Sequence, residues 1–145
     1  LTKYDALVSI KYNGHCQTLG DTATVKNGEV CGTTGRALRL EALSIVGLDN
    51  APGVGIAGQA HVQGIGWQGQ VIFNGSNYIG TKGKALRMEA IKLSLCGSNA
   101  SKYIIKYRVH MQKLGWGAWV TNGNVAGTTG QKRRIEAVQI VLEKR

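Results

Sequence analysis

Residues 103–116 have the sequence YIIKYRVHMQKLGW, which indicates the secondary structure of the whole chain. Apolar and polar residues alternate along it: Ile105, Tyr107, Val109 and Met111 share one face, and Lys106, Arg108, His110 and Gln112 share the other. A period of two is typical of a β-strand with one buried and one solvated face. We therefore expect a strand here that ends before Gly115, with His110 and Gln112 projecting together.

Four short motifs, one in this segment and three after it, occur three times in the same order along the chain. His-x-Gln-x-(Leu/Ile)-Gly stands at 15–20, 61–66 and 110–115, Asn-Gly at 27–28, 74–75 and 122–123, Gly-Thr-x-Gly at 32–35, 80–83 and 127–130, and Arg-x-Glu-Ala at 39–42, 87–90 and 134–137. Repetition at a fixed period indicates copies of one structural unit. We divide the single expected domain, 1–145, into repeat one (1–52), repeat two (53–101) and repeat three (102–145).

Turn signals separate short strands within each repeat. Asn-Gly favours a hairpin tip, Gly-Thr-x-Gly a second turn whose threonines bond local backbone, and no segment has a capped helical pattern. This predicts an all-β fold with three or four strands per repeat. One repeat of about 47 residues buries too little surface to be stable alone, so three should close with pseudo-threefold symmetry. The long first and last strands favour a β-prism over a β-trefoil.

The charge is unevenly distributed over the 145 residues. The net charge is +10, and the three repeats contribute 0, +3 and +7. Repeat three is therefore a candidate surface for anionic polymers, whereas the neutral repeat one and the lack of a recognised nucleic-acid fold disfavour nucleic acid. No apolar run approaches the roughly 20 residues of a membrane helix, so no membrane span is expected. Because the sequence begins at Leu1 and not at Met, we expect a mature form or an expressed fragment, in either case without its leader.

The ordered landmarks, with tryptophan after the His-x-Gln segment in two copies, resemble the clostridial hydrophobic repeat with a conserved tryptophan, the hydrophobic-W repeat. The resemblance covers nearly the whole chain. It implies an extracellular bacterial protein, secreted or on the cell surface, whose repeats mediate adhesion or carbohydrate binding. Some members resemble small hemagglutinins for galactose-type or rhamnose-type sugars. Repeat one departs from the pattern, because Asp21 stands where Trp67 and Trp116 stand.

Candidate carbohydrate-binding residues combine an aromatic surface with donors and acceptors for hydroxyl groups. They are His61, Gln63, Trp67, Asn74, His110, Gln112, Trp116, Trp119 and Asn122, with His15, Gln17 and Asn27 as weaker candidates in repeat one. The opposing interpretation places the tryptophans in the core and makes each His–Gln pair a structural tie. A protein-binding adhesion module without sugar specificity is the alternative function.

Other residues of the repeats are candidates for ion pairing, metal binding or disulfide formation. Each repeat has one glutamate two positions after an arginine, which favours a structural ion pair over a ligand for a sugar diol. Three histidines could converge on zinc only by special placement at the axis, so we expect no metal and no cofactor. No enzyme constellation is found, and we expect no catalytic activity. Cys16 and Cys31 flank the turns of repeat one, which makes a disulfide plausible.

Overall fold

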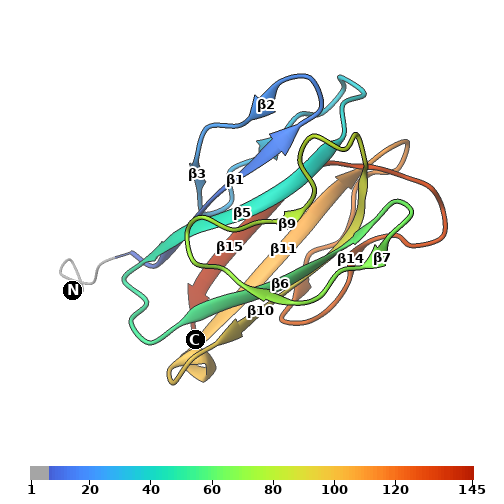
Figure 1. Ribbon diagram of the computed structural model, residues 1–145. Helices are drawn as coiled ribbons and strands as arrows, with labels where there is room; N and C mark the ends of the chain where they lie inside the picture. The colour runs from blue at the N-terminus through green and yellow to red at the C-terminus, as the bar shows by residue number, and fades with distance from the viewer. Residues whose placement is uncertain (1–6) are drawn as a thin grey trace.

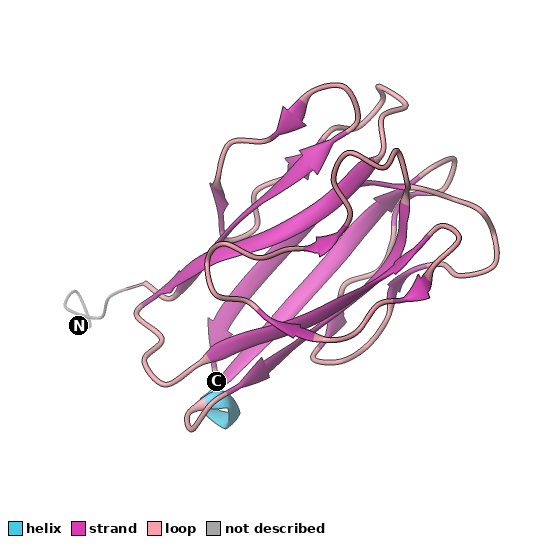
Figure 2. Cartoon of the chain, viewed as in Figure 1, coloured by secondary structure: helices cyan, strands magenta, loops and turns pink. Residues whose placement is uncertain are grey.

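The computed structural model describes residues 7–145 and is an all-β fold (Figures 1 and 2). Repeat one supplies β1 (Ser9–Cys16), β2 (Gly20–Asp21), β3 (Val25–Lys26), β4 (Cys31–Gly32) and β5 (Leu40–Asp49). Repeat two supplies β6 (Gly55–Val62), β7 (Gly66–Trp67), β8 (Val71–Ile72), β9 (Ile79–Gly80) and β10 (Met88–Cys96). A 3-10 turn, η2 (Ala100–Lys102), spans the boundary between repeats two and three. Repeat three supplies β11 (Tyr103–Met111), β12 (Gly115–Trp116), β13 (Val120–Thr121), β14 (Ala126–Gly127) and β15 (Ile135–Lys144).

Three five-stranded sheets surround one core, one sheet built mainly from each repeat. Each sheet is centred on a long antiparallel pair, β1 with β5, β6 with β10 or β11 with β15. The all-β prediction is confirmed, and three sheets of equal strand number are consistent with the favoured prism. Each repeat contains five strands and not three or four, because the turn segments add two-residue strands that the hydrophobic pattern is too short to reveal.

The alternation along the long strands places one shared core inside the three sheets. β11 alternates strictly between buried and partly exposed residues, as its sequence predicts. The inner faces contribute Ile10, Tyr12, Leu43, Ile91, Leu93, Ile105, Tyr107 and Ile140, each at most 1% exposed. These residues come from all three repeats and form one cluster. The apolar surface of each repeat is therefore buried against the other two.

The repeats exchange short strands in a cycle. β9 of repeat two pairs with β5 of repeat one, β14 of repeat three with β10 of repeat two, and β4 of repeat one with β15 of repeat three. The last of these pairings closes the ring between the beginning and the end of the chain. Gly32 and Gly127 permit this close approach: a Cβ on either would lie 2.5 Å from the carbonyl oxygen of Glu136 or Glu89, and both have positive φ.

The expected hairpin at Asn-Gly is wrong. Asn27–Gly28 is a turn, but β3 before it pairs with β1 and β4 after it pairs with the sheet of repeat three, so the flanking strands do not pair with each other. The tight hairpin instead connects β1 to β2 through residues 17–19. The backbone N–H of Gly28 donates to the carbonyl of Ile140, and this bond directs the chain into the neighbouring sheet.

The expected equivalence of Asn74 with Asn27 and Asn122 is also wrong. Val25, Val71 and Val120 take the same register position opposite β1, β6 and β11, so the residues two places later are Asn27, Phe73 and Asn122. Phe73 N donates to Ile56 O just as Asn27 N donates to Ile10 O. Phe73 fits because Gly58 stands where repeats one and three have a tyrosine, and the phenyl ring lies 2.8 Å from where a Cβ on Gly58 would be.

Candidate functional site

A β-bulge at the same place in each sheet positions the glutamate that recurs in each repeat. The pairing of β11 with β15 skips one residue between His110–Ala137 and Met111–Ile135, and the skipped residue is Glu136. Glu41 and Glu89 are skipped in the same way in the other two sheets. A bulge residue is free of the ladder and can turn its side chain toward a neighbour. Each glutamate is consequently only 5% exposed although it is ionisable.

Each buried glutamate is held by an arginine and, in repeats two and three, by a histidine. Glu89 accepts hydrogen bonds from His61 Nδ1 at 2.9 Å and Arg87 Nε at 2.8 Å, and Glu136 accepts them from His110 Nδ1 and Arg134 Nε, both at 3.0 Å. Arg39 Nε bonds Glu41 in repeat one. The expectation of structural Arg–Glu pairs thus agrees with these contacts. The paired charges offset the cost of burying the carboxylates.

Tryptophan lies on the outer face beside each of these two histidines. Trp67 meets His61, and Trp116 meets His110, with ring centroids 5.3 Å apart at 83° in both pairs. Each indole also carries a cation over its face: Lys92 Nζ is 4.4 Å from the Trp67 centroid, and the Arg108 guanidinium is 4.7 Å from that of Trp116. Trp67 and Trp116 are half-buried surface residues and not members of the core.

Repeat one replaces this aromatic arrangement with an ion pair. Asp21 Oδ1 lies 2.8 Å from His15 Nδ1 and 3.2 Å from Lys82 Nζ, which arrives with the turn that follows β9 of repeat two. His15 is accordingly rotated away from the glutamate, with its Nε2 3.9 Å from Glu41 Oε1. Hydrogen bonds from His15 and Lys82 lower the pKa of the Asp21 carboxyl group. Repeat one therefore presents charge where the others present indole.

The predicted glutamines and asparagines are engaged within the protein. Gln17, Gln63 and Gln112 each accept the backbone N–H of the arginine that begins the Arg-x-Glu segment, at 3.1, 3.3 and 3.3 Å. Asn27 bridges two sheets by accepting from the N–H of Ile10 and of Leu142, and Asn122 accepts from Leu95 N at 2.8 Å. Asn74 Oδ1 accepts from Ser76 N and Asn77 N within its own turn. Among the described residues, none of these amide side chains forms a hydrogen bond with a tryptophan.

The most exposed aromatic side chain of the site is Trp119 of repeat three, which is 42% exposed. It shares the Arg108 guanidinium with Trp116, since the guanidinium lies 4.9 Å from the Trp119 centroid and is fixed by a 2.7 Å bond to Gln139. Trp119 also lines an open trough of about 470 Å³. The other trough residues are Lys106, Thr121, Val141 and Glu143.

Sequence reasoning did not identify these trough residues. Lys106 Nζ and Glu143 Oε1 form a 2.6 Å ion pair there, across the outer face of β11 and β15. The alternation of apolar and polar residues places Lys106 on the same strand face as His110. It does not predict that β11 pairs with β15, which is what brings Glu143 next to Lys106. The trough offers an indole surface beside a cation and a carboxylate. Together these groups can cover an apolar face and exchange hydrogen bonds with hydroxyl groups.

The expected disulfide is absent: Cys16, Cys31 and Cys96 are free thiols. Cys31 belongs to β4, which pairs with β15 of repeat three, and its Sγ faces Thr22 Oγ1 at 3.7 Å. Burial raises the pKa of the Cys31 thiol to about 12 and also raises that of Cys16. Both residues therefore act as small apolar core residues.

Three threonine hydroxyls contradict the expectation that the turn threonines bond local backbone. Within residues 7–145, the Oγ1 atoms of Thr33, Thr81 and Thr128 are buried without a hydrogen-bond partner. The backbone N–H groups of these threonines donate instead to the carbonyls of the bulge residues Glu136, Glu41 and Glu89. The threonine backbone, not its hydroxyl, fastens each exchanged strand to its neighbour.

No group of three or more His, Cys, Asp or Glu in the described part of the chain is arranged to hold a metal ion. The three histidines lie on the outer faces of three different sheets, so the zinc alternative does not describe their placement. No helix of residues 7–145 is long and apolar enough to cross a membrane.

The bulge and the Arg–Glu pair recur in all three sheets, and the His–Trp pair recurs in two of them, which defines a tandem-repeat module. A family model described as clostridial hydrophobic W matches residues 15–46, 61–97 and 110–144. These matches cover most of the chain, and the protein belongs to the clostridial hydrophobic W family. No curated protein matches the chain, and no solved structure does.

Proposed function

We propose that the protein is a non-catalytic carbohydrate-binding module of lectin or hemagglutinin type, secreted or displayed at a bacterial surface. Its partners would be galactose-type or rhamnose-type sugars on cell-surface glycans. The observation that carries this proposal is the Trp119 trough, where a 42% exposed indole lies beside the Lys106–Glu143 pair. Membership in the hydrophobic-W family agrees with it.

The three repeats should contribute unequally. In repeat three, Arg108 lies between Trp116 and Trp119 and leaves Trp119 beside the open trough. Repeat two retains Trp67 with Lys92 and is a second site. Repeat one has Asp21 paired with Lys82 at this position and offers no aromatic surface. We therefore assign sugar binding to repeats three and two, in that order of affinity.

A glycan array followed by calorimetric titration tests the proposal. Trp119→Ala should weaken the repeat-three site about tenfold, the equivalent of roughly 1–2 kcal/mol of lost stacking. Trp119→Phe keeps an aromatic ring and is the matched control. Trp67→Ala and Trp116→Ala should each remove about one binding equivalent, and the double variant should fail to agglutinate cells while it stays folded. Full sugar binding by that folded double variant would contradict the assignment.

A protein-binding adhesion module is the second candidate. Leu19, Ile65 and Leu114 occupy equivalent positions in the β1–β2, β6–β7 and β11–β12 turns and are 49%, 51% and 55% exposed. Exposed aliphatic side chains repeated around one end of a protein favour a macromolecular contact. Replacing all three with serine should leave sugar binding unchanged if the first proposal holds. Loss of cell adhesion in that variant, with no array signal for any glycan, would favour the second.

A further inference from the structure

A pocket at one end of the molecule lies outside the surface just described. It has a volume of about 310 Å³, and its lining residues are Gln17, Ala37, Arg39, Gln63, Arg87, Gln112, Lys132 and Arg134. One glutamine and one arginine come from each repeat, at matching positions of the three motifs. Equivalent residues of three repeats can line one pocket only where the pseudo-threefold axis reaches the surface of the molecule. The pocket is therefore a single site that all three repeats build.

The glutamines present donors to this pocket. Each Oε1 already accepts a backbone N–H, from Arg39, Arg87 or Arg134, and this fixes which end of the amide is which because an N–H needs an oxygen acceptor. The Nε2 group of each glutamine, which can donate two hydrogen bonds, is therefore available to a ligand in the pocket. Among the described residues, no hydrogen bond occupies the Nε2 of Gln17, Gln63 or Gln112.

The arginines add further donors and a fixed orientation. Arg39 and Arg87 bond their own glutamates through Nε, and within residues 7–145 their Nη groups make no protein hydrogen bond. Glu41 and Glu89 are buried behind them, with side chains 6% and 7% exposed, against 22% and 21% for the arginines. The carboxylates thus hold the guanidinium groups in place and do not themselves line the pocket. Preorganised donors of this kind lose little freedom on binding an anion.

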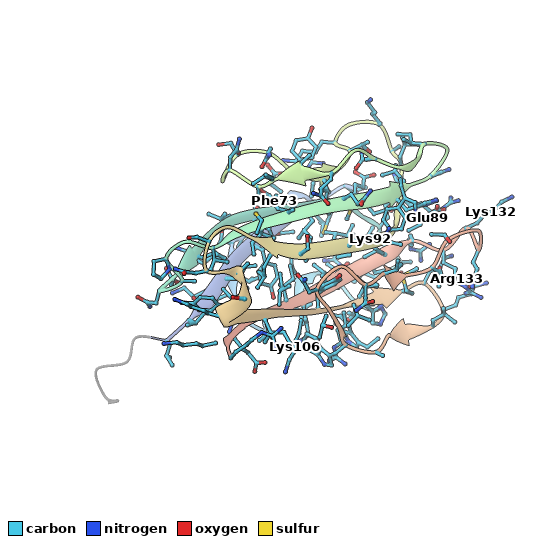
Figure 3. All side chains as sticks on the ribbon, turned by 90° about the horizontal axis from the view of Figure 1, so that it is seen from below. Phe73, Glu89, Lys92, Lys106, Lys132 and Arg133 are labelled. Atoms are coloured by element: carbon cyan, nitrogen blue, oxygen red, sulfur yellow. The ribbon has the colours of Figure 1, made fainter. Side chains whose placement is uncertain are left out.

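Lys132 adds a positive charge to the three arginines of the pocket, and this charge comes from repeat three alone. The equivalent residues in repeats one and two are Ala37 and Ala85, and all three have a φ of 56°. Figure 3 labels Lys132 and Arg133, which both lie at the end of the molecule reached by the turn before β15. The lining thus contains four cationic side chains and three amides, with no carboxylate among the described lining residues.

We propose that this axial pocket binds a tetrahedral oxyanion, a phosphate or sulfate group. A neutral sugar hydroxyl needs acceptors as well as donors, whereas this lining offers donors almost exclusively. Three guanidinium groups around one axis match three oxygens of a tetrahedral anion, and charge-assisted bonds to them are the strong class. The volume admits such a group together with part of the molecule that carries it. The inference is independent of the sugar sites on the outer faces.

The difference between Lys132 and its equivalents Ala37 and Ala85 suggests the variants that test anion binding. Titration of the full chain with inorganic phosphate and, in parallel, inorganic sulfate should show saturable binding, with acetate as the planar control anion. Lys132→Ala installs the residue of the other two repeats and should weaken binding about tenfold. Ala37→Lys adds a second lysine to the lining, at a position whose backbone conformation equals that of Lys132, and it should tighten binding by a similar factor. Lys144→Ala is the charge-matched control and should change little.

The outcomes separate the proposal from general charge attraction. Amide NMR shifts should concentrate at Arg39, Arg87 and Arg134 on anion addition, and tighter binding of phosphate or of sulfate identifies which group the pocket prefers. The proposal is overturned if neither anion binds, if acetate binds equally well, or if Lys144→Ala weakens binding as much as Lys132→Ala. It is also overturned if Ala37→Lys, with an unchanged melting temperature, does not strengthen binding.

Discussion

The hydroxyl of Tyr12 accepts a 3.0 Å hydrogen bond from the backbone N–H of Ile140, 128 positions later in the chain. Tyr12 also donates to the carbonyl of Glu29, so one buried side chain connects the first and last repeats. Tyr107 does the same between repeats three and two, where it accepts from Leu93 N at 3.0 Å. Burial raises the pKa of both phenols, which keeps them protonated and able to donate.

The first prediction concerns this closure of the ring. Tyr12→Phe should lower the free energy of unfolding by about 1–3 kcal/mol, because the buried Ile140 N–H loses its acceptor. Denaturant unfolding measures the change. Tyr103→Phe is the matched control: Tyr103 is 6% exposed, and its hydroxyl makes no hydrogen bond among the described residues. Equal stability of Tyr12→Phe and Tyr103→Phe would show that the Tyr12 bond contributes nothing.

A second prediction uses the unpaired threonine hydroxyls. Thr81→Val should raise the free energy of unfolding by about 1 kcal/mol, because it removes a buried hydroxyl without a partner and keeps the β-branched shape. Thr22→Val is the control, since the Thr22 hydroxyl accepts from Gly14 N at 3.0 Å and its loss should destabilise. A Thr81→Val variant that melts below the native protein would indicate a partner for this hydroxyl.

The third prediction follows from the free thiols. In the native protein, an alkylating reagent should modify Cys96, which is half-buried, and should spare Cys16 and Cys31, whose pKa values are raised by burial. Mass spectrometry after short exposure at pH 8 locates the label. All three should react after unfolding without reductant. Recovery of a single thiol under those unfolding conditions would mean that Cys16 and Cys31 are oxidised.

The repeating pattern of the sequence predicts the strands well, since residues such as Ile105 and Tyr107 alternate over a full strand and each landmark recurs three times. It does not predict how repeats join. The sequence predicts Gly32 to lie in a turn, yet Gly32 pairs with Ala137, which belongs to a strand more than 100 positions away. Pairing between two-residue strands leaves no hydrophobic period to detect.

The candidate site was predictable in its composition but not in its geometry. Trp67 and Trp116 stood out because they recur, whereas Lys106 and Glu143 meet only through the register of two long strands. Asn74 shows the opposite error: a sequence match to Asn27 concealed the insertion of Phe73 at the equivalent position. Local similarity misleads where a neighbouring change, here Gly58, allows a different residue to fill the same space.

The last prediction concerns the pH dependence of the ion pair in repeat one. The pKa of Asp21 is lowered by its hydrogen bonds to His15 and then to Lys82. A carboxyl whose folded pKa is lowered stabilises the fold above its unfolded pKa of about 4, and this contribution is lost as the pH falls through the folded value. Asp21 has a side chain 60% exposed, so solvent screening limits the contribution to below about 1 kcal/mol.

Carboxyl NMR titration of the native protein and of two variants measures this effect. Lys82→Ala should raise the titration midpoint of Asp21 toward its ordinary value, and His15→Gln should raise it further, since the bond to His15 has the larger influence. The native protein should lose free energy of unfolding as the pH falls from about 4 to the lower folded pKa of Asp21, and Asp21→Asn should lose less over the same range. Asp49, whose pKa is lowered chiefly by Ser9, is the internal reference and should not move in either variant. An Asp21 midpoint that is identical in the native protein and both variants would show that neither His15 nor Lys82 stabilises its charge.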